Sequence, residues 1–403
     1  MIVLAGADLV LPDRVLASGT LIIDNGRIEA IDSRVVDGPA GATRIDVSGQ
    51  LIVPGFIDVH VHGVEGIDAL DGPTAVADIA RRLPRYGVTA FCPTSVACAP
   101  AALATFLAGV GASQRVTPER SSRVLGAHLE SNFINPEWNG AQPIGCLRQP
   151  PSSVKGDDSR AKRVGEGEFT GRDILEVIAR ERSQVGIITL APELPGGLDL
   201  VREFVAAGHR VSIGHTGATY ELAREAIAAG VSHATHLFNR MSPMTARAPG
   251  VVGAVLGSDE VAAEIICDAF HVHPSLVATA LRAKTPRLAI AITDGTAGSG
   301  LPPGSRARLG SQTLIVTTQS ALLEDGTLAG SILTMDGAFR MLVERVCLSL
   351  TDAARMCAST PAERLGLTDC GRLEPGGRAD LAILGRDLRV RQTYVGGAPA
   401  LEH

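Results

Sequence analysis

Residues 51–95, LIVPGFIDVHVHGVEGIDALDGPTAVADIARRLPRYGVTAFCPTS, contain the pattern that decides the fold. An apolar run, LIVPGFIDVH, ends in polar residues, an amphipathic segment, TAVADIARRLPRYG, follows it, and a second apolar run, GVTAFCPTS, ends in the same way. Short apolar runs predict buried strands, whereas apolar residues spaced three and four apart predict a helix. The stretch therefore predicts a strand, a helix and a second strand in series.

The same unit recurs along the chain. Six further apolar runs with polar tips are VLGAHLE (124–130), VGIITLAPE (185–193), RVSIGHT (210–216), VSHATHLFN (231–239), AAEIICDAF (262–270) and RLAIAITDG (287–295). Amphipathic segments such as LVREFVAAG and YELAREAIAAG separate most of them. About eight strand-helix units in series predict an α/β fold of the (β/α)8 TIM barrel type, in which chemistry is carried at the carboxyl ends of the strands.

Both ends of the chain are rich in β signals. Near the start, GTLIIDNGRIEAID (19–32) places Asn25-Gly26 between two alternating runs, which predicts a hairpin with a type I′ turn. Near the end stand GRLEPGGRADLAIL (371–384) and VRQTYVGGAP (390–399). Since neither end could bury a sheet alone, we expect residues 1–50 and 360–400 to form a small β-sandwich domain beside a hydrolase barrel of residues 51–359, with residues 401–403 as a tag remnant.

Composition excludes several classes of protein. The 403 residues carry a formal charge of −6 with scattered Lys and Arg, so we expect neither a nucleic-acid partner nor a membrane surface. No apolar run approaches the roughly 20 residues of a bilayer span, and the first residues lack the basic flank of a signal peptide, which predicts a cytoplasmic protein. Seven cysteines without paired spacing predict reduced thiols, and Cys92, Cys267 and Cys347 are expected in the core.

The polar tips of the predicted strands carry the chemistry. Because side chains alternate along an extended chain, His60 and His62 share one face. Four other tips end in Glu130, His215, His236 and Asp294. Any one of these residues could be a hydrogen-bonded structural residue, but imidazoles and carboxylates that converge in one mouth form the ligand set of zinc or iron(II). The pattern therefore predicts a metal site.

The remaining segments and histidines admit simpler interpretations. His128 and His233 precede proposed ligands and either orient them or pack in the barrel. His209, in a helix-to-strand turn, is expected to be solvated, and His273 is expected at the surface or as a helix cap. The polar segment 140–171 is long for a loop, and loops of that length are usually functional or mobile.

Several motifs together resemble a known family. They are PGFIDVHVHG, HLESNFINPEWNGAQP, SIGHTGATYELAREAIAAGVSHATHLFNRMSPMTARAPGVVGAVL, CDAFHVHP, ITDGTAGSG and LAGSILTMDGAF, and they resemble the N-acetylglucosamine-6-phosphate deacetylases of the amidohydrolase superfamily from about residue 20 to 397. The resemblance implies Glu130, His215 and His236 as principal metal ligands and Asp294 as general acid/base. It implies His60 and His62 as ligands of a second site found in some members, and hence one or two divalent ions, zinc or iron(II), per subunit.

The resemblance also implies a substrate and its contacts. The reaction would hydrolyse N-acetylglucosamine 6-phosphate, an amino-sugar phosphate, to glucosamine 6-phosphate and acetate. Implied substrate contacts are Ala141, Gln142, Asn239, Arg240, Arg247, His271, Leu328, Ala329 and Gly330. In the family the arginine at the position of Arg247 reaches in from a neighbouring subunit, which implies a homodimer. On their own, Arg247 could be a solvated loop charge and His271 a strand-end cap.

The chain departs from the family pattern at a few positions. It has Ser131-Asn132 where the family usually has Gly-Pro, Gln142 for His, Ala269 for Gly, and Gly295-Thr296 after Asp294. We expect these changes in the pocket wall, where they could shift the substrate to the galacto epimer, N-acetylgalactosamine 6-phosphate, or to an intermediate of a specialised pathway. A non-catalytic scaffold is a third alternative, and retention of the six ligand and acid/base residues argues against it.

Overall fold

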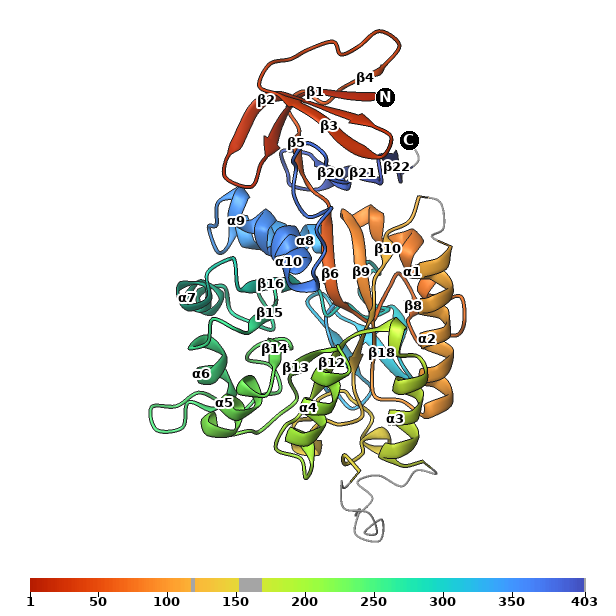
Figure 1. Ribbon diagram of the computed structural model, residues 1–403, viewed down its shortest axis with the longest axis vertical. Helices are drawn as coiled ribbons and strands as arrows, with labels where there is room; N and C mark the ends of the chain where they lie inside the picture. Colours follow the sequence, from red (N-terminus) through yellow and green to blue (C-terminus); the bar gives the residue numbers. More distant parts are fainter. Residues whose placement is uncertain (117–119, 152–168, 402–403) are drawn as a thin grey trace.

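The computed structural model describes residues 1–116, 120–151 and 169–401, and it shows a parallel barrel with a separate sheet at one end (Figure 1). Around the barrel the strands run in the order β6 (Phe56–Val61), β9 (Val88–Ser95), β11 (Ala127–Glu130), β12 (Val185–Leu190), β13 (Arg210–Ile213), β14 (Val231–Ala234), β15 (Ala262–Ile266) and β16 (Ala289–Ile292), and the two-residue β10 (Arg123–Val124) pairs with β9. The barrel closes where the Asp294 N–H donates to the His60 carbonyl at 2.9 Å and the His62 N–H to the Gly295 carbonyl at 2.8 Å. The predicted (β/α)8 barrel is confirmed.

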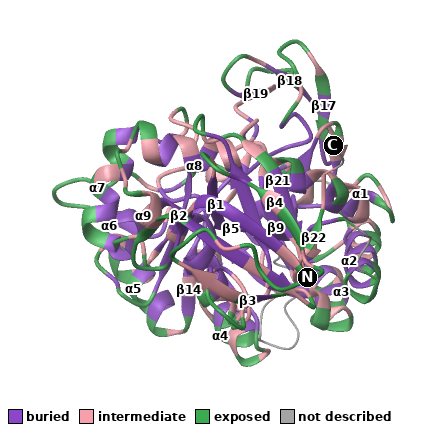
Figure 2. Cartoon of the chain, turned by 90° about the horizontal axis from the view of Figure 1, so that it is seen from above, coloured by how far each residue is buried: buried purple, intermediate pink, exposed green. Residues whose placement is uncertain are grey.

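Helices surround this barrel, with buried residues on their inner faces and exposed residues on their outer faces (Figure 2). On α1, for example, Val76 and Ile79 are buried against the barrel while Arg81 is exposed. The helices are α1 (Ala75–Arg82), α2 (Pro100–Arg115), α3 (Gly171–Arg180), α4 (Gly197–Ala206), α5 (Tyr220–Ala228), α6 (Gly250–Leu256), α7 (Pro274–Lys284), α8 (Met335–Glu344), α9 (Leu350–Ala354) and α10 (Thr360–Leu365). None of the helices in the described part of the chain is long and apolar enough to cross a membrane.

Both ends of the chain contribute strands to one eight-stranded sheet (Figure 1). Its strands are β1 (Ile2–Val10), β2 (Val15–Asp24), β3 (Arg27–Asp32), β4 (Thr43–Asp46), β5 (Leu51–Pro54), β20 (Leu381–Leu384), β21 (Val390–Val395) and β22 (Ala398–Pro399). Asn25 and Gly26, with φ of 47° and 77°, form the β2–β3 turn, and positive φ at both residues is the type I′ signature that the sequence predicted. We call this unit the end sheet.

Three details of the sequence interpretation need correction. The predicted strand 51–60 is divided, because β5 joins the end sheet and only β6 enters the barrel; a Cβ on the intervening Gly55 would lie 2.2 Å from Thr89. A three-stranded sheet, β17 (Arg306–Leu309), β18 (Gln312–Val316) and β19 (Ala321–Leu323), was not predicted. Cys347 is exposed, although Cys92 and Cys267 are buried as expected. Residues 152–168 of the long loop and residues 402–403 lie outside the described residues.

Candidate active site

The polar tips meet at one end of the barrel, and all six predicted ligand and acid/base side chains are buried there. His215, His236 and Asp294 each lie two residues past the end of their strands and have positive φ angles of 49°, 31° and 48°. A left-handed backbone costs a non-glycine residue roughly 1–2 kcal/mol, and such strain clusters at functional sites. We call this end of the barrel the mouth, and the strained backbone at these strand ends marks it as a functional site.

Glu130, His215 and His236 form a compact group, which we call the first ligand group. Glu130 Oε1 lies 2.8 Å from His215 Nε2 and 2.9 Å from His236 Nε2, and the two Nε2 atoms are 3.1 Å apart. His215 Nδ1 faces the Trp138 carbonyl at 2.8 Å and His236 Nδ1 faces the Asn239 carbonyl at 3.2 Å. Because each carbonyl needs an N–H at Nδ1, both Nε2 atoms present lone pairs to one point, an arrangement that suits a divalent metal.

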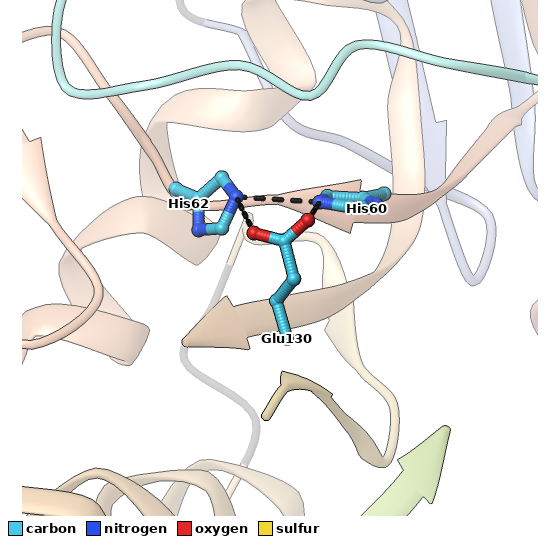
Figure 3. Close-up of side chains that lie close together, drawn as sticks. All are labelled: His60, His62 and Glu130. Atoms are coloured by element: carbon cyan, nitrogen blue, oxygen red, sulfur yellow. Dashed lines mark hydrogen bonds and ion pairs between the residues drawn. The ribbon is translucent and has the colours of Figure 1, made fainter. Parts of the chain in front are cut away.

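His60, His62 and Glu130 form the second ligand group (Figure 3). The two Nε2 atoms are 3.2 Å apart, and Asp294 Oδ1 lies 3.3 Å from each of them. A tetrahedral metal with ligands at about 2.1 Å would place neighbouring ligand atoms about 3.4 Å apart, close to this triangle. His60 Nδ1 faces Glu264 Oε2 at 3.2 Å, which leaves its Nε2 free for a metal. The donor set therefore fits one or two divalent ions.

Electrostatics keep the two carboxylates of the mouth ionised. Burial opposes ionisation of Glu130, but the neighbouring imidazoles of His215 and His236 outweigh it and hold its pKa well below the usual range. Burial likewise opposes ionisation of Asp294, and His60 and His62 lower its pKa further than burial raises it. Ionised Asp294 is the form that can accept a proton.

A pocket opens directly over the first ligand group and collects most of the predicted substrate contacts. It is lined by the ligands Glu130, His215, His236 and His62, by Asp294, and by Gly140, Ala141, Gln142, Asn239, Arg240, His271, Leu328 and Gly330. Ala329 is fully buried beside it and does not line it. Arg247 is exposed and lies outside the pocket of this single chain. Val96, Ile266 and Leu309, which the sequence interpretation did not select, complete the wall.

Most of the departures from the family pattern lie outside this wall, contrary to expectation. Ser131 Oγ donates to the Thr189 carbonyl at 2.6 Å, and Asn132 Nδ2 donates to the carbonyls of Cys98 and Cys146 at 2.8 and 2.7 Å. Ala269, Gly295 and Thr296 are also absent from the lining. Among the six departing residues, only Gln142 faces the pocket, so the expectation was wrong for the other five.

Supporting carboxylates were missed in the sequence. Glu264 is fully buried on β15 against His60, and a charged residue within the apolar run AAEIICDAF was a signal that could have revealed it. Asp268 accepts from His271 Nδ1 at 2.5 Å. The signal for Asp268 was its place at the polar tip of the same run.

The other histidines have structural partners. His128 is fully buried, with Nδ1 2.9 Å from the Val59 carbonyl and Nε2 2.7 Å from Thr189 Oγ1. His233 is buried as well, and burial lowers its pKa to about 3, so it stays neutral. His209 is buried with Nδ1 3.2 Å from the Val185 carbonyl, so the expectation of a solvated side chain was wrong. His273 caps α7 as predicted, since its side chain accepts from the Ser275 N–H.

Comparison with known proteins identifies the class of protein to which this chain belongs. The sequence profile of the amidohydrolase family matches residues 51–399, so the protein is a hydrolase of that class. The N-acetylglucosamine-6-phosphate deacetylase of Bacillus subtilis is 34% identical over 96% of this chain and 94% of its own length. The N-acetylgalactosamine-6-phosphate deacetylase of Escherichia coli O157:H7 is 30% identical over 95% of this chain and 98% of its own length.

Solved structures agree with these relatives. The crystal structure of N-acetylglucosamine-6-phosphate deacetylase from Pasteurella multocida superposes with a TM-score of 0.88 at 27% identity, covering 99% of both chains. The enzyme of that name from Mycobacterium smegmatis, solved as a mutant in complex with N-acetyl-D-glucosamine-6-phosphate, gives a TM-score of 0.86 at 28% identity and covers 100% of this chain and 99% of its own. The chain belongs to the N-acetylglucosamine-6-phosphate deacetylase family of amidohydrolases.

Proposed function

We propose that this protein is a metal-dependent deacetylase that hydrolyses N-acetylglucosamine 6-phosphate to glucosamine 6-phosphate and acetate. The observation that carries the proposal is the first ligand group beside an ionised Asp294, at the floor of a pocket lined by Arg240 and His271. The relatives named above support the choice of an amino-sugar phosphate as substrate.

Hydrolysis requires an activated nucleophile and a proton carrier. Glu130, His215 and His236 would hold a divalent ion such as zinc or iron(II), which when bound would supply water activation at neutral pH and polarisation of the amide carbonyl. His60 and His62 offer a second set, so the proposal includes one or two ions per subunit. Asp294 Oδ1 takes the proton of the attacking water and returns it to the leaving nitrogen as the C–N bond breaks.

Two side chains of the pocket suit a phosphate. Arg240 and His271 both line it, and His271 is held by Asp268, whose hydrogen bond and charge raise the pKa of the imidazole against the opposing effect of burial. A cationic imidazole and a guanidinium are strong donors to phosphate oxygens.

We also propose that the exposed Arg247 completes the phosphate site of a partner subunit, which makes the protein a homodimer. The end sheet is proposed as a domain distinct from the barrel, with the first boundary moved from residue 50 to residue 54, because β5 pairs with β1 and β20.

A second substrate has specific support. The relative from Escherichia coli O157:H7 is named for the galacto epimer, and its likeness to this chain covers nearly the whole length of both. Gln142 faces the pocket where the family usually has histidine, so the sugar contacts differ at one position. Deacetylation of N-acetylgalactosamine 6-phosphate is therefore the alternative function.

Acetate release separates these functions. Enzyme supplied with zinc or iron(II) is assayed on N-acetylglucosamine 6-phosphate, its galacto epimer and unphosphorylated N-acetylglucosamine. We expect the highest kcat/KM on the first substrate and a large loss without phosphate. Higher turnover of the galacto epimer would establish the alternative, and no acetate from any substrate with metal bound would refute the amino-sugar proposal.

A further inference from the structure

Gln142 connects the pocket wall to the metal ligand Glu130. Its Oε1 accepts the Ala97 N–H at 2.7 Å, and its Nε2 donates to Glu130 Oε2. The side chain is only 5% exposed. The amide orientation is fixed by these partners, because a flipped amide would set Nε2 against the Ala97 N–H and Oε1 against the carboxylate.

The same contact divides the two oxygens of Glu130 between different neighbours. Oε1 faces His215 and His236 at 2.8 and 2.9 Å, whereas Oε2 faces Gln142 and, at 3.5 Å, His62 Nε2. Figure 3 shows that His60 and His62 approach different oxygens of this carboxylate. To bridge the two ligand groups, Glu130 must offer Oε2 to an ion beside His62, and that is the oxygen to which Gln142 donates.

We propose that Gln142 is a positioning residue. It keeps Glu130 Oε1 directed at His215 and His236, and its hydrogen bond to Oε2 weakens that oxygen as a ligand for an ion bound by His60 and His62. This inference rests on the proposed metal-dependent function. A donated hydrogen bond occupies one lone-pair direction of Oε2 and lowers the negative charge that the oxygen offers to a cation. The first ion then binds tightly at Glu130, His215 and His236, and a second ion at His60, His62 and Asp294 binds at least about tenfold more weakly.

A neighbouring glutamine provides a matched control. Gln312 Nε2, from β18, donates to the Ala141 carbonyl at 2.6 Å, so it braces the residue next to Gln142 without touching a proposed ligand. Removing the Gln312 amide perturbs the same loop but leaves the Glu130 carboxylate untouched. Any effect seen only at Gln142 is therefore an effect of its bond to Glu130.

The test is a zinc titration of metal-free protein against a competing chromophoric chelator. We expect two dissociation constants at least tenfold apart in the unsubstituted protein. Gln142→Leu should tighten the second constant about tenfold and change the first less than threefold, and Gln312→Leu should change neither. Gln142→Asn, whose amide is one methylene too short to span Ala97 and Glu130, should act like Gln142→Leu. It serves in place of Gln142→Leu if loss of the acceptor for the Ala97 N–H prevents folding.

The outcomes are distinguishable. An unchanged second constant in the Gln142 variants, with the first ion still bound, would overturn this inference and leave the proposed function standing. A weakened first constant alone would also overturn it, because Gln142 would then only support the first group. Failure of the unsubstituted protein to bind any zinc or iron(II) would overturn both the proposed function and this inference.

Discussion

The mouth of the barrel and the end sheet bury very different side chains. The end sheet has an apolar core in which Leu4, Leu9 and Leu21 are fully buried. The mouth buries four imidazoles and two carboxylates, and three of those six residues sit on strained backbone. Burial of apolar surface stabilises a fold, whereas burial of ionisable groups and left-handed backbone at non-glycine residues destabilise it. The comparison indicates that apolar packing in the end sheet and the barrel wall stabilises the fold, while the left-handed backbone of the mouth costs stability and positions the reactive side chains.

The largest expected effect is a loss of activity when Asp294, a residue of the mouth, is substituted. Asp294→Asn removes the proton acceptor but keeps a side chain that tolerates positive φ. We expect kcat to fall about 10³-fold, equal to roughly 4 kcal/mol of barrier, because general acid/base catalysis contributes 10²–10⁴. Acetate release measures the activity, and urea unfolding should show some loss of stability at neutral pH, because the amide cannot replace the carboxylate whose pKa the fold lowers.

A control for this prediction is metal content. Since Asp294 does not belong to the first ligand group, the variant should retain one tightly bound ion. If activity stayed within tenfold of the unsubstituted enzyme, Asp294 would not be the proton carrier, and the assignment of the mouth as the catalytic centre would fail.

The end sheet should show the opposite behaviour. Leu21→Ala in β2 empties a fully buried site and should cost about 3 kcal/mol of unfolding free energy, within the range for buried leucines. Since the end sheet lies away from the pocket, kcat at a permissive temperature should not change. Val15→Ala in the same strand, where the valine is 41% exposed, should change neither quantity measurably. A Leu21→Ala enzyme of normal stability would contradict the comparison.

A smaller effect is expected from pH at His271. Burial lowers the pKa of this imidazole, but the hydrogen bond and charge of Asp268 raise it more, so its folded pKa lies above the unfolded value of about 6.5. The ion pair therefore contributes its full stability below about pH 6.5 and loses it as pH rises through the folded pKa. Over that rise we expect KM for the phosphorylated substrate to increase about tenfold, as a charged hydrogen bond is lost.

Two controls test whether the change in KM with pH comes from His271: a substitution of His271 and a substrate without phosphate. In His271→Gln the rise of KM between pH 6.5 and the folded pKa should disappear. Unphosphorylated N-acetylglucosamine should show no such rise with either enzyme. A rise that persists in His271→Gln would assign the titration to another group.

Much of the barrel could be predicted because its signals are local. Apolar runs and their polar tips gave all eight barrel strands, and strand alternation placed His60 and His62 on one face, where their Nε2 atoms lie 3.2 Å apart. The boundary at Gly55 was missed because a continuous apolar run does not show where a chain passes from one sheet to another. The strands that pair with the two halves, β20 with β5 and β9 with β6, are distant in the sequence.

Side-chain direction in loops could not be predicted. Ser131 and Asn132 directly follow a proposed ligand, yet they bond to backbone carbonyls, whereas Gln142, twelve residues further on, reaches the ligand itself. No periodicity applies to such irregular segments, so sequence position did not show which polar group would meet the metal site.

The smallest expected effect is at Ala269, where strain lies next to the mouth but outside its chemistry. Ala269 has a φ of 62° and does not line the pocket. Ala269→Gly should relieve about 1–2 kcal/mol of left-handed strain and lose about 0.4–1 kcal/mol through the more flexible unfolded chain, for a net gain of up to about 1.6 kcal/mol. Ala108→Gly, at an exposed site inside α2, should instead lose about 1 kcal/mol. Urea unfolding measures the change in unfolding free energy of both variants. A gain for Ala269→Gly and a loss for Ala108→Gly, with kcat unchanged in both, would show that backbone strain beside the mouth can be removed where the side chain takes no part in the reaction. Equal losses would show that the packing of the Ala269 side chain outweighs its backbone strain.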